Sequence, residues 1–314
     1  MEIAGCGNFT VKSVTSWLNV GGRRLDCADS YDTQTSVGIA MGMSPVPRKD
    51  IFVLQKTGNW NPMGYQDSIY QFNNLLQQMN VSYVDLLLNH WPTSPASPAT
   101  DPLCDPEKKS TYDAKGCRLS TWRAYVEFYK NGTALSIGVA NYNITHLQEI
   151  MDAGMILPSV NQVPYHLYNA ASNADLLAFC KANKIVLLSY SPLGIPDWHA
   201  FPTPALPSSK TLTDPVLLSI TAAHAPASAA QVTLSWLWAN GIPCNPRTMN
   251  VQHMTDNLNA ISSVVLTAAE IQQLSNRPID FCTIDNSFYE CVPSNGFLPK
   301  ANPWFVARAK AAAE

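Results

Sequence analysis

The chain has 314 residues, 46% of them hydrophobic, which is enough for one large core or two ordinary ones. Its formal net charge of −3 and its 14% of charged residues give no basic stripe for nucleic acid and no acidic tail. No apolar run reaches the roughly 18 residues that a membrane-spanning helix needs. From the charge pattern we expect no nucleic-acid partner, and from the apolar runs no membrane partner.

Eight short apolar or β-branched stretches along the chain are typical of strands. The fourth, VDLLLNHW, is almost wholly apolar until Asn89 and His90, as in a strand that is buried on both faces. The predicted strands span residues 3–9, 24–29, 51–57, 84–91, 134–142, 159–165, 185–192 and 242–248.

Amphipathic stretches separate most of these strands. Residues 65–80 carry apolar side chains at helical spacing, and the pattern recurs in residues 121–132, 144–153, 173–184 and 228–240. Three glycines stand where helices would end, at positions 132, 154 and 241.

The alternation of strand and helix predicts the α/β class, as a single (β/α)8 TIM barrel with long loops on the C-terminal face. An open, doubly wound sheet is the main alternative, and it would need a glycine-rich phosphate fingerprint after the first strand. Gly5-Cys6-Gly7 lacks the third glycine of that fingerprint, so the barrel is favoured.

Three segments interrupt the alternation, namely residues 92–120, residues 194–215 and residues 279–314. Loops of this length are usually functional, and in a barrel the first two would rise over the active-site face. We therefore expect a catalytic barrel domain over residues 1–278, with the tail of residues 279–314 packed over that face.

Eight cysteines occur without a CxxC motif, so no zinc site is indicated and no metal is expected. Cys104 and Cys117, like Cys282 and Cys291, are close pairs that are either disulfides or free thiols. The compartment stays open between the cytoplasm, as the default, and the secretory pathway, which would follow from disulfides.

Polar residues collect at the ends of consecutive predicted strands and would meet on one face of a barrel. Each has an ordinary interpretation: Lys56 as a surface lysine, His90 as a structural histidine, Tyr31 as a packed aromatic and Asp26 as a helix cap. Their occurrence at neighbouring strand ends favours a shared site over four unrelated roles.

These four side chains suit the addition of a proton to a carbonyl oxygen. A phenol has a pKa of about 10, and a nearby ammonium favours its ionised form. A carboxylate keeps the ammonium charged and in place, and a neutral imidazole can donate a hydrogen bond to the carbonyl. The set offers no nucleophile, electron sink or metal, so a cofactor must supply the electrons.

Several motifs, in order along residues 3–278, resemble those of the aldo-keto reductase superfamily. RRLDCADSYDTQTSVGIAM resembles the first signature, with Asp26 and Tyr31 five residues apart. FVLQKT carries Lys56, and VDLLLNHWP resembles the strand that ends in His-Trp-Pro. SIGVANYN, PSVNQVPYHLYN and LLSYSPLG resemble three further blocks.

The resemblance implies reduction of an aldehyde or ketone to an alcohol by hydride transfer from a nicotinamide cofactor. It implies that Tyr31 is the general acid, that Lys56 and Asp26 tune it, and that His90 orients the substrate carbonyl. A catalytically weak regulatory subunit or sensor that binds the cofactor is the alternative function. A hydrolase with paired carboxylates is disfavoured because Asp26 and Asp29, the two candidates, share one strand.

The resemblance also implies a cofactor site. Asn141 and Gln162 would hold the nicotinamide carboxamide, Tyr190 would stack on the ring, and Ser191 and Leu193 would contact the pyrophosphate. Within PRTMNVQHMTDN, the residues expected to bind the adenosine phosphate and the adenine are Arg247, Thr248, Asp256 and Asn257.

Three departures from the family pattern qualify these expectations. Ala140 replaces a serine, and His253 replaces an arginine that would grip a phosphate more firmly. NADPH is nevertheless the expected cofactor, because Arg247 can bind its 2′-phosphate, and NADH is the alternative. The N-terminal hairpin of many members is expected to be absent.

The substrate is expected to be a small carbonyl compound with an apolar body, because aromatic residues are predicted to line the pocket. The residues expected there are Phe9, Trp60 and Trp91. We expect the protein to be a monomer.

Overall fold

A computed structural model describes residues 8–59, 61–194 and 211–277 of the chain. These residues hold a seven-stranded sheet in which the strand order follows the sequence, from β1 to β7. The pairings β1–β2, β2–β3, β3–β4 and β4–β5 are all parallel. The strands are β1 (Arg24–Asp26), β2 (Phe52–Thr57), β3 (Leu86–Asn89), β4 (Ile137–Ala140), β5 (Val160–Pro164), β6 (Val186–Tyr190) and β7 (Cys244–Asn245).

Ten α-helices and two 3-10 helices accompany the strands in the described residues. The 3-10 helices are η1 (Asp29–Tyr31) and η2 (Arg48–Asp50). The α-helices are α1 (Asn8–Asn19), α2 (Gln34–Met43), α3 (Tyr65–Met79), α4 (Ala114–Lys130), α5 (Ile144–Asp152), α6 (Ala174–Ala182), α7 (Pro215–Ala223), α8 (Ala229–Ala239), α9 (Val251–Ser263) and α10 (Ala268–Ser275). The parallel sheet with helices between its strands confirms the predicted (β/α)8 class.

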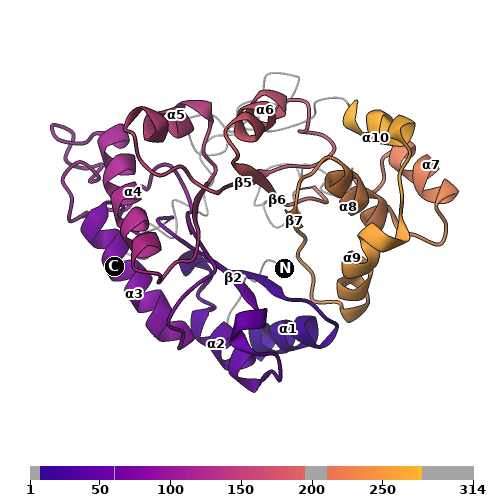
Figure 1. Cartoon of the computed structure of the whole chain (residues 1–314), viewed down its shortest axis with the longest axis horizontal. Helices are drawn as coiled ribbons and strands as arrows, with labels where there is room; N and C mark the ends of the chain where they lie inside the picture. The colour runs from indigo at the N-terminus through magenta and orange to yellow at the C-terminus, as the bar shows by residue number, and fades with distance from the viewer. Residues whose placement is uncertain (1–7, 60, 195–210, 278–314) are drawn as a thin grey trace. The chain divides into compact units, whose positions relative to one another are not determined.

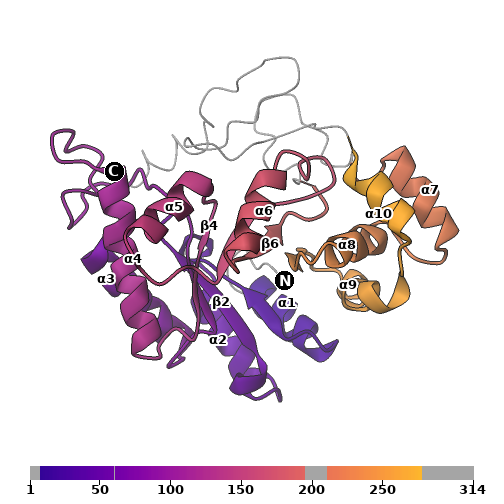
Figure 2. The same ribbon diagram turned by 45° about the horizontal axis from the view of Figure 1, so that its top comes forward.

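The described residues form two compact units. The first comprises the residues up to Val163 together with Phe179–Leu188 and Asn245–Leu258, and the second comprises the remainder. In the first unit, helices α2, α3 and α4 pack in succession, with α3 against β2 and α4 against β3 and β4 (Figure 1). In the second unit, helices α7, α8 and α10 pack against one another (Figure 2).

Side chains from strands β2, β3, β4 and β6 form a core cluster of the first unit. Leu54, Leu86, Leu88, Ala140 and Leu188 make one cluster in which every member is at most 5% exposed. Burial on both faces explains why these strands are almost continuously apolar in sequence. The polar residues that follow the apolar runs therefore mark the ends of the strands.

The helix boundaries follow local capping rules. Asn143 and His146 form a capping box at the start of α5, as Ser228 and Gln231 do at α8. Gly132, Gly154 and Gly241, predicted to end helices, all have positive φ after α4, α5 and α8. No helix in the described part of the chain is long and apolar enough to span a membrane.

Three sequence-based expectations meet the structure differently. Asn8 and Phe9, expected at the end of a first strand, instead begin α1. Helix α4 begins at Ala114, inside the segment 92–120 that was expected to be a loop. The expectations for the strand and hairpin before residue 8, for Trp60 and for the tail of residues 279–314 fall outside the described residues.

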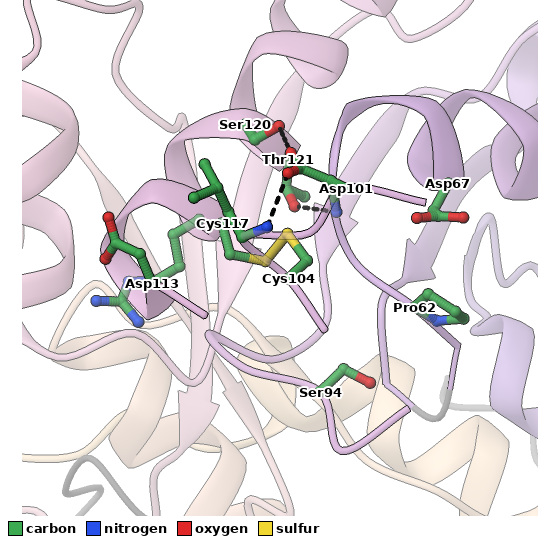
Figure 3. The surroundings of a disulfide bond; sticks show 12 residues. Pro62, Asp67, Ser94, Asp101, Cys104, Asp113, Cys117, Ser120 and Thr121 are labelled. Carbon is green, nitrogen blue, oxygen red and sulfur yellow. Dashed lines mark hydrogen bonds between the residues drawn. A yellow bond between two sulfur atoms is a disulfide. The ribbon is translucent and has the colours of Figure 1, made fainter. Parts of the chain in front are cut away.

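A disulfide between Cys104 and Cys117 ties the loop after β3 to helix α4 (Figure 3). Its sulfurs pack with Met63 and Ala99 in a small buried cluster. Beside it, Ser120 Oγ donates to Asp101 Oδ2 over 2.6 Å. The Cys104–Cys117 pair, left open in the sequence between a disulfide and free thiols, is therefore a disulfide, while Cys282 and Cys291 lie outside the described residues.

Replacing both cysteines by alanine is expected to lower the free energy of unfolding by about 3 kcal/mol, because the bridge closes a loop in the unfolded chain. The two cysteines are 13 residues apart, which sets the size of that loop. Urea unfolding of Cys104→Ala/Cys117→Ala and of the reduced wild type checks this result. Equal stability of the oxidised wild type and the double variant would contradict it.

Candidate active site

A buried ion pair between Asp26 and Lys56 forms the centre of the candidate site. Asp26 ends β1 and pairs in register with Leu54 of β2, so Lys56, two residues further along β2, lies on the same face of the sheet. Asp26 is 2% exposed and Lys56 is 1% exposed, and the ammonium Nζ donates to Asp26 Oδ1. Charges buried this deeply must be paired, because an isolated one would cost several kcal/mol.

Two amides complete the surroundings of the Asp26 carboxylate. Gln162, on β5, donates from Nε2 to Asp26 Oδ2 over 2.6 Å. Asn245, on β7, donates from Nδ2 to the same oxygen over 2.5 Å. The carboxylate thus receives donors from three other strands.

Tyr31 lies on η1, directly after β1, and is half-buried. Lys56 Nζ lies 5.2 Å from the centroid of its ring. The turn that carries Tyr31 is anchored to the loop after β2, because Asn61 Nδ2 donates to Asp29 Oδ2 over 2.9 Å and Asn59 Nδ2 donates to Ser30 Oγ over 3.2 Å. Burial raises the pKa of Asp29 to about 6 despite these hydrogen bonds.

His90 follows β3 and faces Tyr31. The two rings meet edge to face with their centroids 5.9 Å apart. The backbone N–H of His90 donates to the backbone carbonyl of Thr57 over 2.8 Å. Burial, aided by the charge of Lys56, holds the pKa of His90 well below 6.5, so the imidazole is neutral at pH 7. Its buried Nδ1 has no hydrogen-bond partner among the described residues.

A matching pH dependence of stability is expected. Because the folded pKa of His90 lies below the unfolded value of about 6.5, the unfolded chain binds the extra proton as pH falls, and stability falls with it. Between pH 7 and 5, wild type should lose stability relative to His90→Asn by up to about 1.4 kcal/mol per pH unit. Urea unfolding at several pH values checks this, and parallel curves for both proteins would contradict it.

The residues expected at the nicotinamide start from two neighbouring strands. Asn141 follows β4 with φ of 62°, its N–H donates to Gln162 O over 2.8 Å, and its Nδ2 donates to His90 O over 2.9 Å. Both residues therefore contact the central group: Asn141 bonds to the backbone of His90, and Gln162 bonds to the side chain of Asp26.

The residues expected at the adenosine phosphate and the adenine lie just before α9 and within it. Arg247, two residues after β7, is exposed, and Thr248 Oγ1 accepts from the Asn250 N–H over 3.1 Å. Asp256 accepts from Gln252 Nε2 over 2.9 Å, and Asn257 is half-buried on the same helix.

Three further expected cofactor residues belong to the second unit. Tyr190 ends β6 and is half-buried, and its carbonyl accepts from the Tyr165 N–H over 3.3 Å. Ser191 has φ of 49°, and its carbonyl accepts from the Gly194 N–H over 3.0 Å. Leu193 is half-buried.

The residues expected to line the substrate pocket differ in their surroundings. The Trp91 ring stacks beside that of His90, with centroids 6.2 Å apart and planes 28° apart. Phe9 lies on α1 and is 76% exposed. Trp60 falls outside the described residues.

One residue of the central group was not singled out in the sequence. Asn245 carries no part of the family resemblance, which in this stretch lies on Arg247 and Thr248. A polar amide just before the proline that ends a short apolar strand was the available signal. In the described residues, no group of three or more His, Cys, Asp or Glu is placed to hold a metal.

Comparison with known proteins defines the class of the fold first. The chain aligns with the crystal structure of Bombyx mori aldo-keto reductase in complex with NADP at a TM-score of 0.71 and 25% identity, covering 85% of this chain and 82% of that one. This likeness, together with the parallel sheet, places the chain among the (β/α)8-barrel proteins.

Sequence comparison then gives the family. The model of the aldo/keto reductase family matches residues 8–276. The chain is 31% identical to morphine 6-dehydrogenase of Pseudomonas putida, over 87% of this chain and 86% of that one. It is 30% identical to glyoxal reductase of Bacillus subtilis, over 80% and 77%. The chain belongs to the aldo/keto reductase family of oxidoreductases. Membership of this family supports carbonyl reduction with a nicotinamide cofactor.

Proposed function

We propose that this protein reduces an aldehyde or ketone to an alcohol with NADPH, using Tyr31 as the general acid. The observation that carries the proposal is that an ammonium group and a neutral imidazole both lie beside the Tyr31 ring. The Lys56 ammonium lies 5.2 Å from the centre of its ring, and the neutral ring of His90 meets it edge to face.

The residues fit a nicotinamide cofactor by the chemistry of their donors and acceptors. The side-chain amides of Asn141 and Gln162 each carry a donor and an acceptor, as a carboxamide requires of its partners. When bound, the reduced nicotinamide supplies a hydride. The central side chains in the described residues offer proton donors and charges but no electron source. The chemistry of the cofactor and that of these side chains are therefore complementary.

The roles of the side chains follow from their charges. His90, being neutral, donates an N–H to the carbonyl oxygen and fixes its direction. Tyr31 then gives its phenolic proton to that oxygen and becomes a phenolate, which the Lys56 ammonium stabilises. Asp26 keeps the ammonium charged and in place, and solvent restores the proton to the half-buried Tyr31.

The preference for NADPH rests on Arg247. Its exposed guanidinium directly precedes Thr248, and a permanently charged planar group suits a 2′-phosphate. His253, also exposed, is a weaker partner for a phosphate. We propose that Arg247 alone gives NADPH its advantage over NADH.

Titration with NADPH and with NADH, followed by protein fluorescence, tests the cofactor assignment. Tight binding of NADPH and weak binding of NADH are expected, with the difference lost in Arg247→Met. Equal binding of both would overturn the preference. Binding of NADPH without turnover of any aldehyde or ketone would favour the regulatory subunit over the enzyme.

The disulfide supports a proposal about location. Disulfides persist mainly in oxidising compartments, so the Cys104–Cys117 bridge favours the secretory pathway over the cytoplasm. Mass spectrometry after alkylation of the unreduced protein, isolated from its own cells, tests this. Alkylated Cys104 and Cys117 would contradict it. The expected monomer is tested by light scattering.

A further inference from the structure

Asn245 is a buried amide at the end of β7, and it reaches the charged group to which β1 contributes Asp26 and β2 contributes Lys56. It is 8% exposed, and its Nδ2 donates to Asp26 Oδ2. The sequence separation between the two residues is 219, so the contact depends on the fold and not on local structure. A buried amide without a partner would cost free energy, and this carboxylate is the partner that Asn245 has for its donor.

The Asp26 carboxylate divides its two oxygens between different donors. Oδ1 receives the Lys56 ammonium, and Oδ2 receives both amides, from Gln162 and Asn245. This division fixes the plane of the carboxylate, because rotation would break the hydrogen bonds on both oxygens. It also leaves Oδ1 directed at Lys56.

We propose that Asn245 is a positioning residue, which holds the Asp26 carboxylate in the orientation that keeps Lys56 beside Tyr31. The role rests on the function proposed above for Tyr31. Asn245 touches neither Tyr31 nor Lys56 in any hydrogen bond between the described residues, so its effect passes through Asp26.

The charges around the pair explain why one amide matters. Lys56 is 1% exposed, and its ion-pair partner is Asp26. The other titratable groups near Lys56 or Asp26 are Cys27, Asp29, Tyr31 and His90. Burial, helped by the charge of Asp26, raises the pKa of Cys27 to about 12, and His90 is neutral, so neither replaces the charge of Asp26 at pH 7. Asp29, with a pKa of about 6, carries charge at pH 7, but its carboxylate accepts from Asn61, and the ion pair of Lys56 is with Asp26.

Removal of the amide should therefore act through the orientation of Asp26. Asn245→Leu deletes one of the two amide donors to Oδ2, so the plane of the carboxylate is held less firmly. A carboxylate that turns no longer directs Oδ1 at the Lys56 ammonium, which then loses its fixed position beside Tyr31. Turnover should fall for that reason, while substrate and cofactor still bind.

The test compares kcat at pH 7 in wild type, Asn245→Leu and Asn245→Ser, with cofactor affinity measured alongside. For Asn245→Leu we expect kcat to fall on the order of tenfold, the scale of one lost hydrogen bond to a charged group. The KM for the aldehyde and the Kd for NADPH should stay within about twofold. Asn245→Ser, a smaller and uncharged change that keeps a hydroxyl donor, should fall between the two.

Asn161→Leu serves as the matched control. Asn161 is another fully buried amide on a strand, but its side chain bonds to the backbone of Tyr142. It should lose stability without lowering kcat of the folded protein. Values of kcat for both Asn245 variants that equal that of an active wild type would overturn this role alone, whereas an inactive wild type would overturn the proposed function and this role with it.

Discussion

Tyr31→Phe is expected to lower kcat/KM for an aromatic aldehyde by about 10³-fold, because the substitution removes only the hydroxyl group, which is the proposed proton donor. The affinity for NADPH should stay unchanged, since the ring and its edge contact with His90 remain. Steady-state kinetics and a fluorescence titration of the same preparations measure both quantities.

Tyr70→Phe is the control for this experiment. Tyr70 lies on α3 and is 73% exposed, so the loss of its hydroxyl should leave kcat/KM within about twofold of wild type. A Tyr31→Phe variant with at least a tenth of wild-type activity would contradict the role of Tyr31 as general acid.

Lys56→Met is expected to lower the free energy of unfolding by about 3–5 kcal/mol and to abolish detectable turnover. The methionine matches the length of the lysine stem but leaves the Asp26 carboxylate buried with only two amides as donors. Urea unfolding at pH 7 measures the loss of stability, and the same samples give the activity.

An exposed lysine provides the comparison. The Lys108 side chain is 55% exposed and lies 3.6 Å from Asp105, so Lys108→Met should change stability by less than about 1 kcal/mol. If Lys56→Met were as stable as Lys108→Met, the ion pair with Asp26 would not be the buried, mutually dependent pair described here.

The strands and the four central residues could be predicted because their signals are local. Buried parallel strands are continuous apolar runs, and Asp26, Lys56 and His90 stand where such runs end. Tyr31 follows Asp26 by five residues, within the same motif. A resemblance between motifs carried the assignment of their roles.

Helix α2 could not be predicted from its pattern. Gly38 lies within it, and glycine usually signals a break in a helix. In the structure a Cβ at Gly38 would come within 2.3 Å of the carbonyl oxygen of Met79, so the glycine permits close packing of α2 against the end of α3. That requirement is visible only when both helices are in place.

The hydrogen bonds to Asp26 were equally hidden. Gln162 was expected at the nicotinamide, yet its Nε2 donates to Asp26, 136 residues away in sequence. Asn245 joins the same oxygen from 219 residues away. Such pairings depend on the register of distant strands, which periodicity within one strand does not contain.

Transfer of deuterium from labelled NADPH to an aldehyde tests the central claim most directly. The protein is mixed with an aromatic aldehyde and NADPH that carries deuterium at the hydride-donating carbon, and the alcohol is analysed by mass spectrometry. The proposal predicts deuterium on the carbinol carbon with wild type and almost none with Tyr31→Phe. Tight NADPH binding by wild type without any deuterated alcohol, over a panel of aldehydes and ketones, would contradict it.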